Sequence, residues 1–124
     1  MGVPRLLIGV VLAVVLTWTS QAWSHAYLVR SRPGARASLA RAPERVELWF
    51  NERLEPAYSG MSVWNAAAQR VDTGDARVES AEPTQLSVRV NALPAGAYTV
   101  RYRVLSVDGH LVESEFAFRV RGAP

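Results

Sequence analysis

From residue 25 onward, apolar and polar residues alternate in short runs, and this period-two pattern is typical of half-buried β-strands. The clearest run places Val46, Leu48 and Phe50 on one side and the polar or amphipathic residues between them on the other. The same alternation recurs four more times. We therefore predict strands within 46–50, 61–64, 86–90, 98–104 and 116–120, with weaker candidates at 27–30 and 69–72.

Turn-forming residues separate these runs. Pro33-Gly34, Gly74-Asp75 and Asp108-Gly109 are pairs that end strands and start turns, and residues 34–42 fit a loop better than a helix. Short strands with such breaks, and no convincing helix, predict an all-β fold: an antiparallel Greek-key β-sandwich or barrel. Within it, the segment 93–98 predicts a tyrosine corner, in which the hydroxyl of Tyr98 bonds to upstream backbone.

The first 24 residues have a different pattern, that of a secretory signal. Arg5 precedes the unbroken apolar run Leu6–Leu16, and Ala22 and Ser24 supply the small residues of a cleavage site. The apolar run is shorter than the roughly 20 residues that span a membrane. We expect a signal peptide at 1–24 and one exported domain at 25–124, with a retained anchor as the alternative.

The charge pattern argues against nucleic acid as a partner. All 14 basic residues are Arg, 11 residues are acidic, and the formal net charge is +3. Arginines alternate with apolar residues along the predicted strands, and glutamates lie among them, which indicates a solvated strand face rather than a phosphate-binding stripe. The chain has no Cys, which excludes a thiolate metal site, a blue-copper centre and a Cys nucleophile.

The chain contains only two histidines, His25 and His110. Cleavage after Ser24 would make His25 the first residue, so that its free α-amine and its imidazole Nδ1 could close a chelate ring on one metal ion. Asp108 and His110 are spaced i, i+2, and the Gly between them allows both side chains to converge. Three nitrogens and one carboxylate oxygen form a tetragonal set that favours Cu(II).

Other interpretations of these residues stay open. Asp108-Gly109 is a common hairpin turn pair without any metal, and two histidines with a carboxylate also suit zinc. The domain would then be a sandwich module for adhesion or assembly, or a zinc protein. A copper ion held by an N-terminal histidine also suits an oxidase or monooxygenase, although Asp108 would compete for the open coordination position.

Beyond these residues, the sequence resembles the CopC family of periplasmic copper-resistance proteins over essentially all of 25–124. The resemblance rests on the segments 25–28, 31–33, 46–52, 93–98, 106–110 and 116–118. It implies a seven-stranded cupredoxin-like or immunoglobulin-like barrel with a Cu(II) site made by His25, Asp108 and His110. It also implies a non-catalytic, monomeric periplasmic carrier that buffers copper or delivers it to a CopD-type membrane transporter.

Three positions qualify the resemblance. Glu52 matches an acidic residue that the family places near the copper site, although an exposed glutamate at a strand end is the preferred interpretation. Some members carry a methionine-rich Cu(I) site in a central loop, but residues 65–75 contain no Met, and Met61 fits the core. We therefore expect Cu(II) binding alone. Ser114 replaces a usual Gly, which leaves the nearby turn less defined by sequence.

Overall fold

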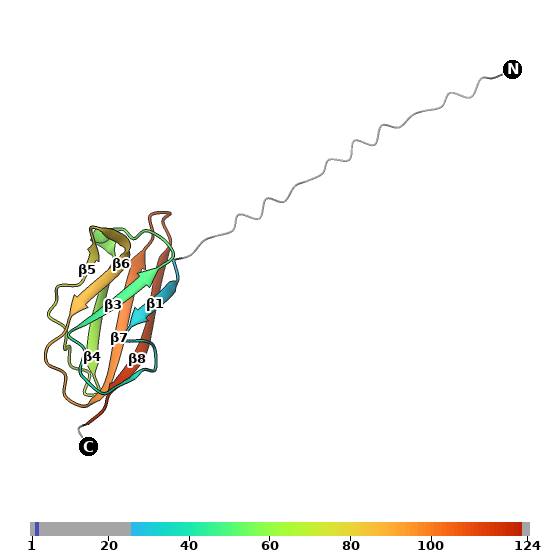
Figure 1. Ribbon diagram of the computed structural model, residues 1–124. Coiled ribbons are helices and arrows are strands. Elements are labelled where there is room, and N and C mark those ends of the chain that lie inside the picture. The colour runs from blue at the N-terminus through green and yellow to red at the C-terminus, as the bar shows by residue number, and fades with distance from the viewer. Residues whose placement is uncertain (1, 3–25, 123–124) are drawn as a thin grey trace.

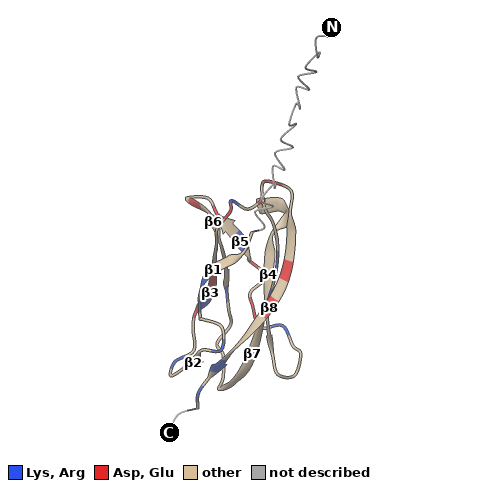
Figure 2. Cartoon of the chain, turned by 90° about the vertical axis from the view of Figure 1, so that its right-hand side faces the viewer, with Lys and Arg blue, Asp and Glu red and all other residues tan. Residues whose placement is uncertain are grey.

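The computed structural model describes Gly2 and residues 26–122, so the predicted signal peptide and His25 lie outside the described residues. The alternating segments form two four-stranded sheets packed face to face (Figures 1 and 2). The first sheet has the order β1 (Leu28–Arg32), β3 (Arg45–Phe50), β6 (Glu82–Arg89) and β5 (Arg77–Glu79). The second has the order β2 (Ser38–Leu39), β8 (Leu111–Val120), β7 (Gly96–Leu105) and β4 (Gly60–Asn65).

The chain crosses from one sheet to the other after each of the strands β1 to β4 and again after β6, so that strands distant in sequence become neighbours. Such crossings are the Greek-key connections of a β-sandwich, and the predicted all-β sandwich class is confirmed. Among the described residues, the one helical element is the 3₁₀ turn η1 (Pro56–Tyr58). Within 26–122, no helix is long and apolar enough to cross a membrane.

The core fills the space between the sheets with the apolar positions of the alternating pattern. Val46, Leu48 and Phe50 of β3 are almost fully buried, and Met61 is buried as predicted. The remaining strands contribute their own inward residues, Val63, Leu86, Val88, Tyr98, Val100, Val104, Phe118 and Val120. Close packing of these side chains replaces the disulfides that the chain does not have.

Two sequence predictions need correction. The described residues form eight strands rather than seven, because two short strands were not predicted: β2, a two-residue parallel pairing with the end of β8 inside the predicted loop 34–42, and β5, which pairs with β6. Residues 69–72 do not form a strand but make two isolated bridges, at Arg70 and Asp72. The ladder breaks there because the backbone N–H of Val63 donates to the Asp72 side chain instead of a backbone carbonyl.

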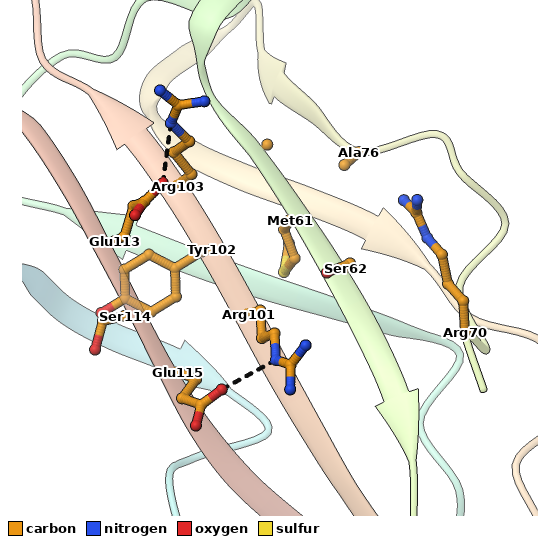
Figure 3. Close-up of a pocket in the computed structure, with 11 residues that line it drawn as sticks. Met61, Ser62, Arg70, Ala76, Arg101, Tyr102, Arg103, Glu113, Ser114 and Glu115 are labelled. Atoms are coloured by element: carbon orange, nitrogen blue, oxygen red, sulfur yellow. Dashed lines mark hydrogen bonds and ion pairs between the residues drawn. The ribbon is translucent and has the colours of Figure 1, made fainter. Parts of the chain in front are cut away.

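The tyrosine corner predicted at 93–98 is present. The Tyr98 hydroxyl donates to the carbonyl oxygen of Pro94 at 2.5 Å, and its ring stacks on Phe118. This contact fixes the start of β7, one of the two inner strands of the second sheet. On the solvent side of the same hairpin, Arg101 and Arg103 form cross-strand ion pairs with glutamates of β8 (Figure 3).

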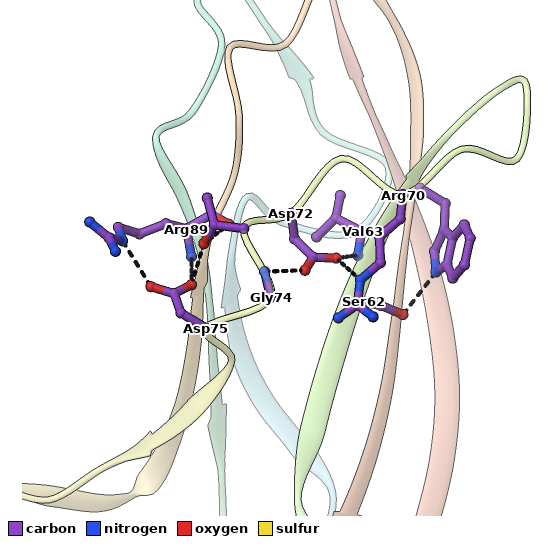
Figure 4. A network of polar contacts seen from close by, with 9 residues as sticks. Ser62, Val63, Arg70, Asp72, Gly74, Asp75 and Arg89 are labelled. Carbon is purple, nitrogen blue, oxygen red and sulfur yellow. Dashed lines mark hydrogen bonds and ion pairs between the residues drawn. The ribbon is translucent and has the colours of Figure 1, made fainter.

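A buried carboxylate fastens the loop 66–76 to the edge of β4 (Figure 4). The Asp72 side chain is fully buried and accepts hydrogen bonds from the N–H groups of Val63 (2.9 Å) and Gly74 (2.8 Å) and from Nε of Arg70 (2.8 Å). Burial acts to raise the pKa of Asp72, but the three donors outweigh it and the pKa is lowered. The ionised form therefore stabilises the fold.

We predict that Asp72→Asn lowers the free energy of unfolding at neutral pH by about 2 kcal/mol, because an amide cannot accept all three hydrogen bonds. A lowered pKa contributes stability above the unfolded value of about 3.9 and loses it as the pH falls through the folded value. The difference in unfolding free energy between wild type and variant should therefore become smaller below about pH 4. Urea unfolding at neutral and acidic pH measures this difference, and Glu82→Gln, at an exposed position, is the control. A difference that is independent of pH would contradict a stabilising role of the ionised Asp72.

Candidate metal centre

The turn between β7 and β8 carries two of the three predicted metal ligands. Leu105 and Leu111 are the last paired residues of the hairpin, and residues 106–110 form the turn between them. The turn is closed by backbone hydrogen bonds from Ser106 N–H to the carbonyl of His110 (3.0 Å) and from Gly109 N–H to the carbonyl of Ser106 (2.9 Å). Gly109 has φ +93°, a conformation that side-chain-bearing residues rarely adopt. The glycine between Asp108 and His110 is thus required by the turn.

Asp108 and His110 lie against each other. The Nδ1 atom of His110 is 3.1 Å from Oδ1 of Asp108, and both side chains are partly exposed, at 23% and 33% respectively. A proton on Nδ1 leaves the lone pair of a neutral imidazole on Nε2, which is the nitrogen that binds a metal in that tautomer. The structure therefore brings Asp108 and His110 into contact, and their binding of one metal ion stays a prediction.

The buried Ser106 hydroxyl contacts both Asp108 and His110. It donates to Oδ1 of Asp108 and lies 3.3 Å from the backbone N–H of His110. The pKa of Asp108 is lowered to about 2, mainly by the Ser106 hydroxyl and further by His110, although desolvation acts in the opposite direction. The carboxylate is therefore ionised at neutral pH, as a metal ligand must be.

This structural role of Ser106 was not predicted from the sequence. A Ser in a turn often hydrogen-bonds to a backbone group a few residues away, as Ser106 does with the N–H of His110, and this is the signal that could have identified it.

The first described residues are anchored at the same end of the sandwich. Ala26 is 1% exposed, so its position is set by the core. The N–H of Tyr27 donates to the side-chain oxygen of Asn51 at 2.6 Å, and the N–H of Asn51 donates back to the carbonyl of Tyr27 at 3.2 Å. Residues 26 and 27 therefore lie directly beside the end of β3.

The residues that follow β3 also contact the turn. Leu54 bridges Ser106, and the N–H of Val107 donates to the carbonyl of Arg53 at 2.9 Å. Residues 51–54 therefore contact Tyr27 on one side and the β7–β8 turn on the other. In Figure 1 the end of β3 and the β7–β8 turn lie at the same, upper end of the sandwich. His25 precedes Ala26 directly and lies outside the described residues, so its part in the site stays a prediction.

Glu52 lies in this connecting segment and is half-buried rather than exposed. Within the described part of the chain, no group of three His, Asp or Glu side chains is close enough to hold a metal ion. Glu52 therefore does not form such a group with Asp108 and His110.

A pocket of about 620 Å³ lies away from this turn, beside β4, β7 and β8 (Figure 3). Its charged lining consists of Arg70, Arg101 and Arg103 with Glu113 and Glu115, and each of these arginines is paired with a carboxylate. Because those charges neutralise one another, the pocket is not a concentrated site for an ion, and the β7–β8 turn is the better candidate.

Comparison with known proteins identifies the family. Residues 28–121 match the model of the CopC domain. The crystal structure of CopC from Methylosinus trichosporium OB3b aligns with a TM-score of 0.75 at 35% identity, covering 81% of this chain and 97% of that one. Copper resistance protein C of Pseudomonas syringae pv. tomato is 31% identical over 106 residues, 81% of this chain and 83% of the relative.

A longer relative contains the same domain. Copper transport protein CutJ of Bacillus subtilis is 32% identical over 99 residues, which are 79% of this chain but only 18% of that protein. The family model spans the whole sandwich, including the β7–β8 turn and all eight strands. The chain is therefore a member of the CopC family.

Proposed function

We propose that this protein is a copper-binding protein that holds one Cu(II) ion through the α-amine and imidazole of His25, together with Asp108 and His110. Copper is its cargo. The observation that carries the proposal is the pair of anchors on residues 51–54: one fixes Tyr27, two residues after His25, and the other fixes the turn that bears Asp108 and His110. The names of the relatives, copper resistance protein C and copper transport protein, support copper as the metal.

The donor set accounts for the choice of Cu(II). One amine nitrogen, two imidazole nitrogens and a carboxylate oxygen suit a tetragonal ion, and Cu(II) stands highest in the affinity order of divalent first-row metals. Asp108 contributes a carboxylate that is already ionised because Ser106 and His110 lower its pKa to about 2. The α-amine, with an ordinary pKa near 7.7–8.0, must lose its proton, so affinity should fall with pH.

The role that fits this site is transport or buffering rather than catalysis. Four donors fill the tetragonal plane and leave little room for a substrate to bind the metal. We infer that the protein is exported to the periplasm, acts as a monomer, and either sequesters Cu(II) or passes it to a CopD-type membrane copper transporter. The presence of a matching domain inside a longer copper transport protein supports delivery to a transporter.

We predict that protein beginning at His25 binds one equivalent of Cu(II) and shows nitrogen hyperfine structure in its electron paramagnetic resonance spectrum. One extra Gly before His25 displaces the amine and should weaken binding at least about tenfold, the effect of losing roughly 1.4 kcal/mol. A Gly added after Pro124 is the matched control. Equal affinity of the two extended proteins would exclude the amine as a ligand, and unchanged binding in His110→Ala would exclude the turn.

We predict that Ser106→Ala raises the pKa of Asp108 from about 2 toward the ordinary value near 3.9, because the hydroxyl that stabilises the anion is lost. Loss of such a supporting hydrogen bond should weaken copper binding by about 10- to 100-fold. An NMR pH titration of metal-free protein and a copper competition assay measure the two effects. The control is Ser59→Ala, whose hydroxyl contacts the backbone of Leu105 at the same end. An unshifted Asp108 titration would show that Ser106 has no electrostatic part.

A further inference from the structure

The outer face of the first sheet is rich in arginine. Strand alternation places the side chains of five arginines on the solvent side of β1, β3, β5 and β6: Arg30, Arg32, Arg45, Arg77 and Arg89. Three carboxylates pair with members of this set, namely Glu47, Glu79 and Asp75. Figure 2 shows the two sheets edge-on, with blue segments on β1 and β3 and red segments on β8. β3 also contains the acidic Glu47, and β8 the basic Arg119.

The carboxylates of this face lie beneath the arginines. The side chain of Glu47 is 16% exposed, whereas that of its partner Arg32 is 72% exposed. Glu79 and Asp75 are covered in the same way, and Ser87, which donates to Glu79 at 2.5 Å, is 2% exposed although it points to the solvent side. The guanidinium groups are therefore the outermost charges of this face.

The second sheet has a different charge arrangement. Its ion pairs join Arg101 to Glu115 and Arg103 to Glu113, and all four side chains are about equally exposed (Figure 3). The positive and negative groups of these two pairs are thus equally exposed to solvent and neutralise each other. Arg119 of β8 adds a further exposed arginine, so the second face carries three arginines and two glutamates, whereas the first carries five arginines and three carboxylates. The first face is therefore the more positive of the two.

Aromatic and apolar side chains accompany the arginines at β1. The guanidinium of Arg30 lies 4.0 Å from the ring centre of Trp49, and that of Arg32 lies 5.9 Å from it. Tyr27 and Val29, from the same stretch of chain, are 62% and 61% exposed. Arginine, tryptophan and tyrosine together are typical of side chains at the boundary between lipid headgroups and acyl chains.

We propose that the face made by β1 and β3, with Arg30, Arg32, Trp49, Tyr27 and Val29, docks onto the headgroup layer of an anionic phospholipid membrane. Charge complementarity supports this occupant. The sequence pattern predicted a solvated face with neutralised charges, but the structure places the carboxylates beneath the guanidinium groups, so that these groups can meet phosphodiesters. The exposed apolar residues match the headgroup boundary. β1 is an edge strand, so this margin of the sandwich is open to a flat surface. The inference does not depend on copper.

The test uses metal-free protein 25–124 and vesicles of phosphatidylcholine with or without phosphatidylglycerol. Sedimentation should show binding to the phosphatidylglycerol vesicles, suppressed by high salt. The double variant Arg30→Gln/Arg32→Gln should lose binding several-fold. Arg101→Gln/Arg103→Gln, which removes the same charge from the opposite face, should retain it. Two results would overturn the proposal. One is the absence of vesicle binding at low salt, which is expected if the face recognises an acidic protein instead. The other is an equal loss of binding in the two double variants.

Fluorescence then identifies the face in contact. Within 25–124 the only tryptophans are Trp49 on this face and Trp64, which lies beside Arg101 on the other. In Trp64→Phe, phosphatidylglycerol vesicles with brominated acyl chains should quench Trp49 as the protein binds. Sedimentation of this variant without quenching would show that a different face meets the membrane and would refute the proposal.

Discussion

The candidate metal centre depends on the four residues that follow β3. Residues 51–54 pair with Tyr27 through Asn51 and with the β7–β8 turn through Arg53 and Leu54, so that two segments almost eighty residues apart in sequence meet there. Leu54 is 2% exposed, which ties the connecting segment to the core. Because folding has already ordered both segments, a metal ion that binds there does not incur the full entropy cost of assembling its ligands.

The turn itself is stabilised by polar groups rather than by apolar packing. Ser106 is buried at the base, Gly109 provides the positive φ, and Asp108 is held against His110. The carboxylate is thereby ionised and oriented in the metal-free protein. In the proposed site the remaining donors would come from His25, in a different part of the chain, and proteolytic processing would expose its amine. Such a division suits a protein that carries a metal ion as cargo.

The sequence predicted those parts of the fold in which one face of a strand is strictly apolar. β3 alternates over its whole length and β7 over residues 98–104, so their faces follow from period two. A two-residue strand such as β2 is too short to show a period, and the 69–72 segment was misassigned because the Asp72 carboxylate replaces a backbone acceptor. Asp108 and His110 were proposed as ligands because histidines are rare in this chain, whereas the role of the Ser106 hydroxyl depends on its contact with Asp108 in the folded turn.

The most direct measurement of the central claim is an NMR spectrum of ¹⁵N-labelled protein beginning at His25, recorded with increasing Cu(II). Bound Cu(II) broadens the amide signals of nearby residues. If the two segments share one ion, the signals of Ala26 and Tyr27 will disappear together with those of Asp108 to Leu111, while residues at the opposite end of the sandwich keep theirs. Broadening confined to the turn, or to the first residues alone, would contradict a site built from both.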